Sequence, residues 1–195
     1  MVFGFGKQKR VSAADQLASG KWKCVSCDEW HRWPFDLAAF APDPWPHEVA
    51  YEQNGDLRFD GDFLSEDFCI LGGKHFMVRA ILPVSVIGVP GEFAFGCWST
   101  LSETNFDKYI DGFDAGEYPD APQWTGWLMN RLADLAPGAE PLGVIVQPQP
   151  GRQRPMLWVQ DEEHPLAIAQ SEGITAERML EVFGHYGHAP AATEG

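Results

Sequence analysis

The amino-acid sequence predicts an α+β domain, in which a mostly antiparallel sheet is followed by C-terminal helices. Runs rich in β-branched and aromatic residues, separated by glycine and proline, are concentrated between Phe68 and Gln160. Two of the three clearest helix-start signals come after these runs. Strands first and helices late are typical of an α+β fold, because a parallel α/β fold would alternate the two.

Three strands are predicted as an antiparallel meander over Phe68–Leu71, His75–Ile87 and Phe93–Ser99, because short glycine- and proline-containing turns separate them. A hairpin is predicted from Gly143–Gln147 and Pro155–Gln160, which flank a turn rich in proline and glycine. The segment 124–129 is a further candidate strand.

Three helices have recognisable start signals. Ser102 is a capping residue whose neighbours Leu101 and Phe106 can pack together across the helix start. Pro165 suits a first helical position and Gly173 suits the residue after a helix, so a helix is predicted over 165–172. Thr175 then caps a third helix, predicted over 176–185.

The expected organisation is a flexible basic arm over 1–20, a single domain over 21–187 and a disordered tail over 188–195. The N-terminal part of that domain contains cysteines and is expected to be irregular, because three prolines fall within Ala41–Pro46. One short helix could interrupt this irregular stretch before residue 61.

The charge of the chain is strongly negative. The net charge is −14, and residues 28–67 contain eleven Asp and Glu but only two arginines. Nucleic-acid binding is not expected, because it depends on Lys and Arg that neutralise phosphates. Solubility is the simplest role for this acidity, a basic protein partner is the second, and mimicry of DNA by spaced carboxylates is a third.

A cytoplasmic location without membrane insertion is expected. No apolar run reaches the roughly 18 residues of a membrane span, and no apolar core of a signal peptide follows the basic residues near the start. The four cysteines are too few and too unevenly placed for a disulfide scaffold in a chain of 195 residues. The sequence does not indicate an oligomeric state.

Several separated motifs give the chain a resemblance to a known family. They are Cys24-x-x-Cys27-x-x-x-His31, Phe68-Cys-Ile-Leu71 with Phe76-Met-Val-Arg79-Ala80, Phe95-Gly-Cys-Trp-Ser-Thr-Leu-Ser102, Thr125-Gly-Trp127, and His164-Pro-Leu-Ala167 with Gln170-Ser-Glu-Gly-Ile174. In order and spacing the chain resembles the bacterial domain of unknown function 2199 over roughly residues 22–183. It departs from the family in its basic arm and in Trp33-Pro34, where Leu-Pro is usual. The resemblance implies one compact bacterial cytoplasmic domain and no particular activity.

The sharpest chemical feature is the pair Cys24 and Cys27 with His31 four residues later. Two thiolates in one tight turn and an imidazole are typical zinc ligands, and Cys69 is the candidate for the fourth. We therefore predict a structural zinc at Cys24, Cys27, His31 and Cys69. Inert buried cysteines and a redox-active pair are the alternatives, although the residues after Cys27 do not have the helical pattern of a thioredoxin-type site.

A second candidate site is a pocket formed by Arg79, Trp98, Trp127 and His164. Arg79 interrupts an apolar strand, so its guanidinium must find an acidic or carbonyl partner, either within the fold or on a ligand. His164 follows three carboxylates at a helix start, where a general base could lie, although acidic residues are ordinary at that end of a helix.

The eight tryptophans fall into two groups. Trp98, Trp124, Trp127 and Trp158 are expected in the core, because they lie on predicted strands. The N-terminal group could cover the cysteine turn or form a protein-binding face. It consists of Trp22, Trp30, Trp33 and Trp45.

These features favour a small interaction or accessory protein, such as an adaptor or an immunity protein. The alternative is an enzyme, such as a metal-dependent hydrolase, that uses the Cys/His site or a pocket around Arg79 and His164. Common catalytic signatures, including a Gly-rich phosphate loop and a His-Glu-x-x-His helix, are missing from the sequence.

Overall fold

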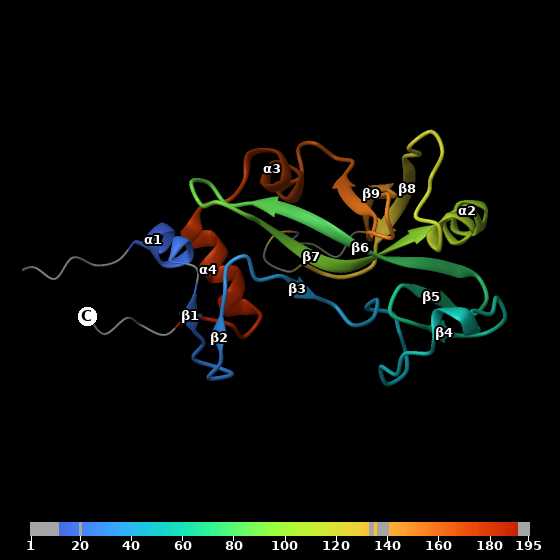
Figure 1. Ribbon diagram of the computed structural model, residues 1–195, viewed down its shortest axis with the longest axis horizontal. Helices are drawn as coiled ribbons and strands as arrows, with labels where there is room; N and C mark the ends of the chain where they lie inside the picture. The colour runs from blue at the N-terminus through green and yellow to red at the C-terminus, as the bar shows by residue number, and fades with distance from the viewer. Residues whose placement is uncertain (1–11, 20, 133–134, 136–140, 191–195) are drawn as a thin grey trace, which may run out of the picture.

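The computed structural model describes residues 12–19, 21–132, 135 and 141–190 (Figure 1). Its main sheet has eight strands in the order β3-β7-β8-β9-β10-β6-β5-β4, with β7 also paired to β6. A separate two-stranded sheet, β1-β2, lies beside helix α4 at one end of the molecule, and β4 and β5 lie at the other end. The long strands β6 and β7 connect the two ends.

The centre of the fold is the antiparallel hairpin of β6 (His75–Ser85) and β7 (Glu92–Leu101). The two strands are in continuous register from Phe76 opposite Leu101 to Ser85 opposite Glu92. Gly91 in the connecting turn has a φ of 100°, a conformation that glycine adopts without a steric penalty.

Five strands close into a barrel. Strand β7 pairs antiparallel with β8 (Trp124–Leu128), which pairs with β9 (Leu142–Gln147), which pairs with β10 (Met156–Val159). Strand β10 then pairs in parallel with β6 through Met156 opposite Ile81, and β6 returns to β7. The expectation of a mostly antiparallel sheet is therefore corrected to a mixed, closed five-stranded barrel within an α+β fold.

The physical reason for this correction is that closure depends on pairs far apart in the chain. Apolar runs and turn residues predict each strand and each hairpin, but they do not specify that β10 meets β6 rather than ending at an open edge. Closure also removes the exposed edges that an open sheet would leave.

Three short strands extend the barrel. Strand β5 (Phe68–Leu71) continues the antiparallel meander from β6, and β4 (Phe63–Leu64) pairs with β5. Strand β3 (Leu37–Ala38) lies parallel to β7, a second parallel pairing that the local pattern does not predict. The predicted meander of three strands is confirmed.

Helices α2 and α4 begin at the predicted capping residues Ser102 and Thr175, and α3 begins at the predicted Pro165. Ser102 Oγ accepts a hydrogen bond from the N–H of Asn105 at the start of α2 (Glu103–Phe113). His164 Nδ1 accepts one from Leu166 at the start of α3 (Pro165–Glu172). Thr175 caps α4 (Ala176–His185) in the same way. The bounds predicted for the last two helices are confirmed.

The N-terminal region contains one helix that the sequence does not predict. Helix α1 (Ala13–Ala18) falls within the predicted arm and packs against α4, with Leu17 fully buried. It is followed by β1 (Trp22–Lys23) and β2 (Trp30–His31). A 3₁₀ turn, η1, spans Asn54–Asp56, within the stretch before residue 61 where one short helix is expected. Residues 1–11 of the predicted arm and 191–195 of the predicted tail lie outside the described residues.

The buried side chains form two clusters on opposite faces of the β6–β7 hairpin. The larger cluster includes barrel residues such as Val78 and Phe93 together with the inward faces of all four helices. The smaller cluster consists of Leu64, Cys69, Met77 and Trp98. Because both faces are buried, β6 is apolar along most of its length.

Of the four tryptophans on predicted strands, two are buried and two are exposed. Trp98 is fully buried and Trp124 is 8% exposed, as expected for core residues. Trp127 and Trp158 are 53% and 36% exposed, so the expectation that they are core residues is wrong. Side chains alternate between the two faces of a strand, and these two project from the outer face of the barrel.

Candidate metal centre

The β1–β2 hairpin brings together three candidate ligands. Trp22 pairs with His31 across the two strands, so His31 lies close to the loop that contains both cysteines. The N–H of Cys24 donates to the carbonyl of Glu29 over 2.9 Å and closes that loop. Asp28 has a φ of 58°, a left-handed conformation in which aspartate is enriched relative to most residues. This reversal turns Cys27 back toward His31.

The fourth candidate ligand comes from the other end of the chain. After α4, the N–H of His188 donates to the carbonyl of Phe183 over 2.7 Å. The N–H of Val25 then donates to the carbonyl of Ala189, and Cys24 and Pro190 form an antiparallel bridge. These contacts hold the segment after α4 against the cysteine loop.

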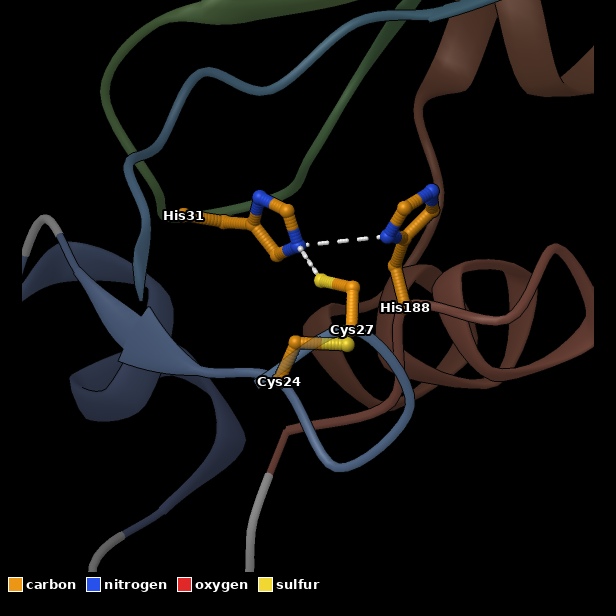
Figure 2. Close-up of side chains that lie close together, drawn as sticks. All are labelled: Cys24, Cys27, His31 and His188. Atoms are coloured by element: carbon orange, nitrogen blue, oxygen red, sulfur yellow. Dashed lines mark hydrogen bonds between the residues drawn. The ribbon is translucent and has the colours of Figure 1, made fainter. Parts of the chain in front are cut away.

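Four ligand atoms from Cys24, Cys27, His31 and His188 all lie within 4.8 Å of one another and could hold a metal ion. Cys27 Sγ is 3.3 Å from His31 Nε2, and His188 Nδ1 is 3.1 Å from that same nitrogen. Figure 2 shows both contacts converging on the imidazole of His31, with Cys24 beside Cys27.

These separations agree with tetrahedral coordination. With Zn–N bonds of about 2.05 Å and Zn–S bonds of about 2.3 Å, the edges of a tetrahedron measure roughly 3.3 Å between two nitrogens and 3.6 Å between nitrogen and sulfur. The observed distances of 3.1 Å and 3.3 Å are each slightly shorter than these edges. The two contacts of His31 Nε2 are therefore close to the edges of such a tetrahedron, and all four ligand atoms lie within 4.8 Å of one another.

The protonation equilibria also favour metal ligation. Burial by itself would raise the pKa of Cys24, but hydrogen bonds from the backbone N–H groups of Cys27 and Ser26 outweigh it, and the pKa lies below its ordinary value. The Ser26 N–H is 3.3 Å from Cys24 Sγ. Burial and the nearby His188 lower the pKa of His31, which favours the neutral imidazole. A thiolate and a neutral imidazole are the forms that bind a metal.

An aromatic cluster holds the hairpin on α4. Trp22 stacks on Phe183 with ring centroids 5.1 Å apart, and Phe35 lies 4.1 Å from the His31 ring and 5.0 Å from the His188 ring. These contacts restrict the orientations of both imidazoles. The candidate metal centre thus lies where the two ends of the described chain meet.

Cys69 does not join the predicted group. It lies on β5 at the opposite end of the molecule, buried among Leu64, Met77 and Trp98, and His188 supplies the fourth ligand atom in its place (Figure 1). Burial raises the pKa of the Cys69 thiol to about 12, and the same effect raises that of Cys97 to about 12. Both are protonated thiols at neutral pH, unlike ordinary metal ligands.

Of the four residues of the second predicted site, the structure brings together only Arg79 and Trp98. Arg79 and Trp98 are direct neighbours on β6 and β7. Trp127 is exposed on β8. The preceding residue, Gly126, packs so closely on the Thr100 carbonyl that a Cβ added to it would overlap that oxygen. His164 caps α3. Within the part of the chain that the structure describes, no hydrogen bond or ion pair joins Arg79 to Trp127 or His164.

His188 is the residue that sequence reasoning missed. It is one of two histidines near the C-terminus, with His185, and lies 157 positions after His31, so no local spacing connects it to His31. The only available signal was the residue type, because histidine is a common metal ligand wherever the chain folds back on itself.

The fold and the site define an α+β barrel protein with a Cys₂His₂ group that could hold a metal ion. A model of the family described as an uncharacterised protein conserved in bacteria (DUF2199) matches residues 23–174, and the chain belongs to this family. No curated protein and no solved structure matches the chain. The matched region includes Cys24, Cys27 and His31, whereas His188 lies beyond its end. No helix in the described ranges is long and apolar enough to cross a bilayer.

Proposed function

We propose that Cys24, Cys27, His31 and His188 bind a structural zinc ion in a small interaction or accessory protein. The observation that carries this proposal is the convergence of four ligand atoms, within 4.8 Å, from two segments at opposite ends of the chain. Two thiolates and two imidazoles match the Cys₂His₂ set of structural zinc sites. A zinc ion here would join the β1–β2 hairpin to the segment after α4.

The number of protein ligands favours a structural role over a catalytic one. A catalytic zinc keeps one coordination position for water or substrate, whereas a structural zinc is closed by four protein ligands. His188 completes a set of four. A metal-dependent hydrolase would require one of these four side chains to leave the ion open.

Reduced thiols support a cytoplasmic location for this protein. Zinc binds the thiolate form of cysteine, and the reducing conditions of the cytoplasm preserve it. Cys27 is exposed, so an oxidising compartment would put the pair at risk of disulfide formation.

A basic protein is the partner that the charge distribution favours. Residues 28–67 contain eleven acidic residues and two arginines. The same stretch includes the exposed apolar side chains of Phe40, Val49 and Phe59. Acidic groups around exposed apolar side chains suit a partner that has basic residues around an apolar centre.

Metal analysis of the untagged protein tests the zinc proposal. We expect about one zinc per chain after purification without chelators, with loss of that zinc in Cys27→Ser and full retention in Cys97→Ser, whose thiol is buried away from the site. Zinc that stays bound to Cys27→Ser, or a wild-type protein that neither contains nor takes up zinc, would refute the site.

Capture from a lysate of the native host tests the partner proposal. A basic protein retained at low salt and weakened at moderate salt is expected, because screening reduces attraction between charged surfaces. Recovery of no basic protein under either condition would contradict this part of the proposal and leave the zinc site unaffected.

A further inference from the structure

Arg79 and Trp98 form a buried pair on the face of the β6–β7 hairpin that lies away from the main core. They are directly opposite each other in the antiparallel register, and the Arg79 guanidinium carbon is 6.0 Å from the Trp98 ring centroid. Arg79 is 7% exposed and Trp98 is fully buried. Arg79 therefore carries a formal positive charge inside the protein.

Among the residues that the structure describes, no carboxylate forms a hydrogen bond or ion pair with the guanidinium of Arg79. Its two hydrogen bonds run from one terminal nitrogen to Tyr51 Oη over 3.4 Å and to the Glu66 carbonyl over 3.5 Å, both at the long end of the hydrogen-bonding range. The nearby carboxylate of Asp67 is bonded instead to Arg154 and Asn54. Buried charges are normally paired, because an unpaired one loses its hydration without compensation.

Two buried donors on this pair have no hydrogen-bond acceptor within the described ranges of the chain. They are Arg79 Nε and the indole nitrogen of Trp98. Both groups can only donate, and buried donors of native proteins are nearly always satisfied. An oxyanion could accept from both and would also neutralise the guanidinium.

Tyr51 lies at the surface end of this pair. It is 36% exposed, its hydroxyl donates to the Phe40 carbonyl, and the same oxygen accepts from Arg79. Residues 41–51 have no regular secondary structure, and only a bridge between Glu52 and Ser65 and the 3₁₀ turn η1 follow directly after Tyr51. A small ligand would approach the guanidinium beside this tyrosine.

We propose that Arg79 and Trp98 form a binding site for a small carboxylate, whose oxygens accept from Arg79 Nε and the Trp98 indole N–H. A planar carboxylate matches the planar guanidinium. The acidic residues of the surrounding segment repel a doubly charged phosphate more than a singly charged carboxylate. The site uses none of the four candidate metal ligands, so a failure of the zinc proposal would not affect it, and its own failure would not affect the zinc proposal.

Acetate is the probe for this site, with sodium chloride of equal ionic strength as the reference. Acetate is expected to raise the melting temperature of the wild-type protein above that in chloride, in a saturable manner, because a ligand stabilises the state that binds it. Lys74→Met, which removes an exposed positive charge elsewhere, is expected to respond like the wild type. Arg79→Met is expected to show no difference between the two salts.

Trp98→Phe keeps an aromatic ring and removes only the indole donor, so it tests the site even if Arg79→Met does not fold. We expect it to need several-fold more acetate for the same response. The Arg79 Nε–H resonance of wild-type protein should also shift on addition of acetate.

Four results would overturn the proposal. An equal response of the wild type to acetate and chloride would mean that ordered water satisfies the donors, and an acetate response retained in Arg79→Met would mean that the effect is non-specific. Destabilisation by Glu66→Gln in chloride, as large as that by Arg79→Met, would identify the Glu66 carboxylate as an internal partner. An Arg79-dependent response to inorganic phosphate but not to acetate would replace the carboxylate with phosphate.

Discussion

His188 Nδ1 lies 3.1 Å from His31 Nε2, although 157 positions of sequence separate the two residues. Two imidazole nitrogens at this distance either share a proton or share a metal ion. Cys27 Sγ, at 3.3 Å from the same nitrogen of His31, favours the metal, because both contacts converge on a single atom. The stability of the N-terminal hairpin should then depend on the C-terminal segment.

The first prediction is that His188→Ala releases the metal and destabilises the protein. Loss of a bound metal is one of the changes that lower the free energy of unfolding by more than about 4 kcal/mol. For a chain of this size, a loss of that size lowers the melting temperature by roughly 8–16 °C. Calorimetry with parallel metal analysis measures both. His75→Ala, at an exposed position outside the cluster, is the control and should retain the metal; equal behaviour of the two variants would refute the role of His188.

The second prediction separates Cys69 from the metal centre. Cys69→Ser should keep the metal, because the thiol lies in the cluster with Leu64, Met77 and Trp98 rather than near Cys24. Burial of a hydroxyl in its place should lower the free energy of unfolding by about 1–3 kcal/mol. Denaturant titration and metal analysis of the same sample measure the two effects. Loss of metal from this variant would restore Cys69 as a ligand.

The third prediction concerns Asn130, which links the irregular N-terminal segment to β7. Its side-chain oxygen Oδ1 accepts from the backbone N–H of Trp98 over 2.8 Å, and its side-chain nitrogen Nδ2 donates to the Ala41 carbonyl and to Asp43. Asn130→Ala leaves these groups without their partner and should lower the free energy of unfolding by about 2–3 kcal/mol.

Gln53→Ala, at an exposed position, is the matched control for Asn130→Ala. It should lower the free energy of unfolding by less than about 0.5 kcal/mol. Chemical denaturation of both variants measures the difference. A cost for Asn130→Ala as small as that of the control would show that this amide does not hold the segment in place.

The fourth prediction is a pH effect at Asp62. A hydrogen bond from His47 over 2.7 Å, and a second from the N–H of Gly72, lower the pKa of this carboxyl below its ordinary 3.8. Because the folded pKa is depressed, the stabilisation is complete above 3.8 and is lost as the pH falls through the folded value. Carboxyl carbon resonances measure the pKa.

His47→Ala removes the largest cause of this shift and should raise the pKa of Asp62 toward 3.8. A titration midpoint at or above 3.8 in the wild-type protein would contradict the described contacts. Asp56, an acidic residue of the same segment, is a convenient resonance for comparison in the same spectra.

Local features of the sequence predict most of the individual elements. The strand over 68–71 and the helices over 165–172 and 176–185 have the predicted bounds, since glycine turns and capping residues act over a few positions. The α1 helix was missed because its six residues follow a basic stretch, and its one buried side chain, Leu17, gives no periodic pattern. Packing against α4, rather than intrinsic propensity, stabilises a helix of this length.

Long-range relationships are what local sequence reasoning could not predict. Barrel closure depends on the pairing of Met156 with Ile81, and the candidate metal centre depends on the contact between His188 and His31. Cys24, Cys27 and His31 were found because they lie within one hairpin, whereas the choice of Cys69 as fourth ligand rested on residue type alone. Tertiary folding selects the distant ligand, and its position carries no local signal.

X-ray absorption spectroscopy of the zinc-loaded, untagged protein tests the central proposal most directly, because it reports which atoms surround the ion. The Cys₂His₂ site predicts two sulfur neighbours at about 2.3 Å and two nitrogen neighbours at about 2.0–2.1 Å, with one nitrogen neighbour lost in His188→Ala. A wild-type spectrum with three protein ligands and a water oxygen, unchanged by His188→Ala, would contradict a closed structural site.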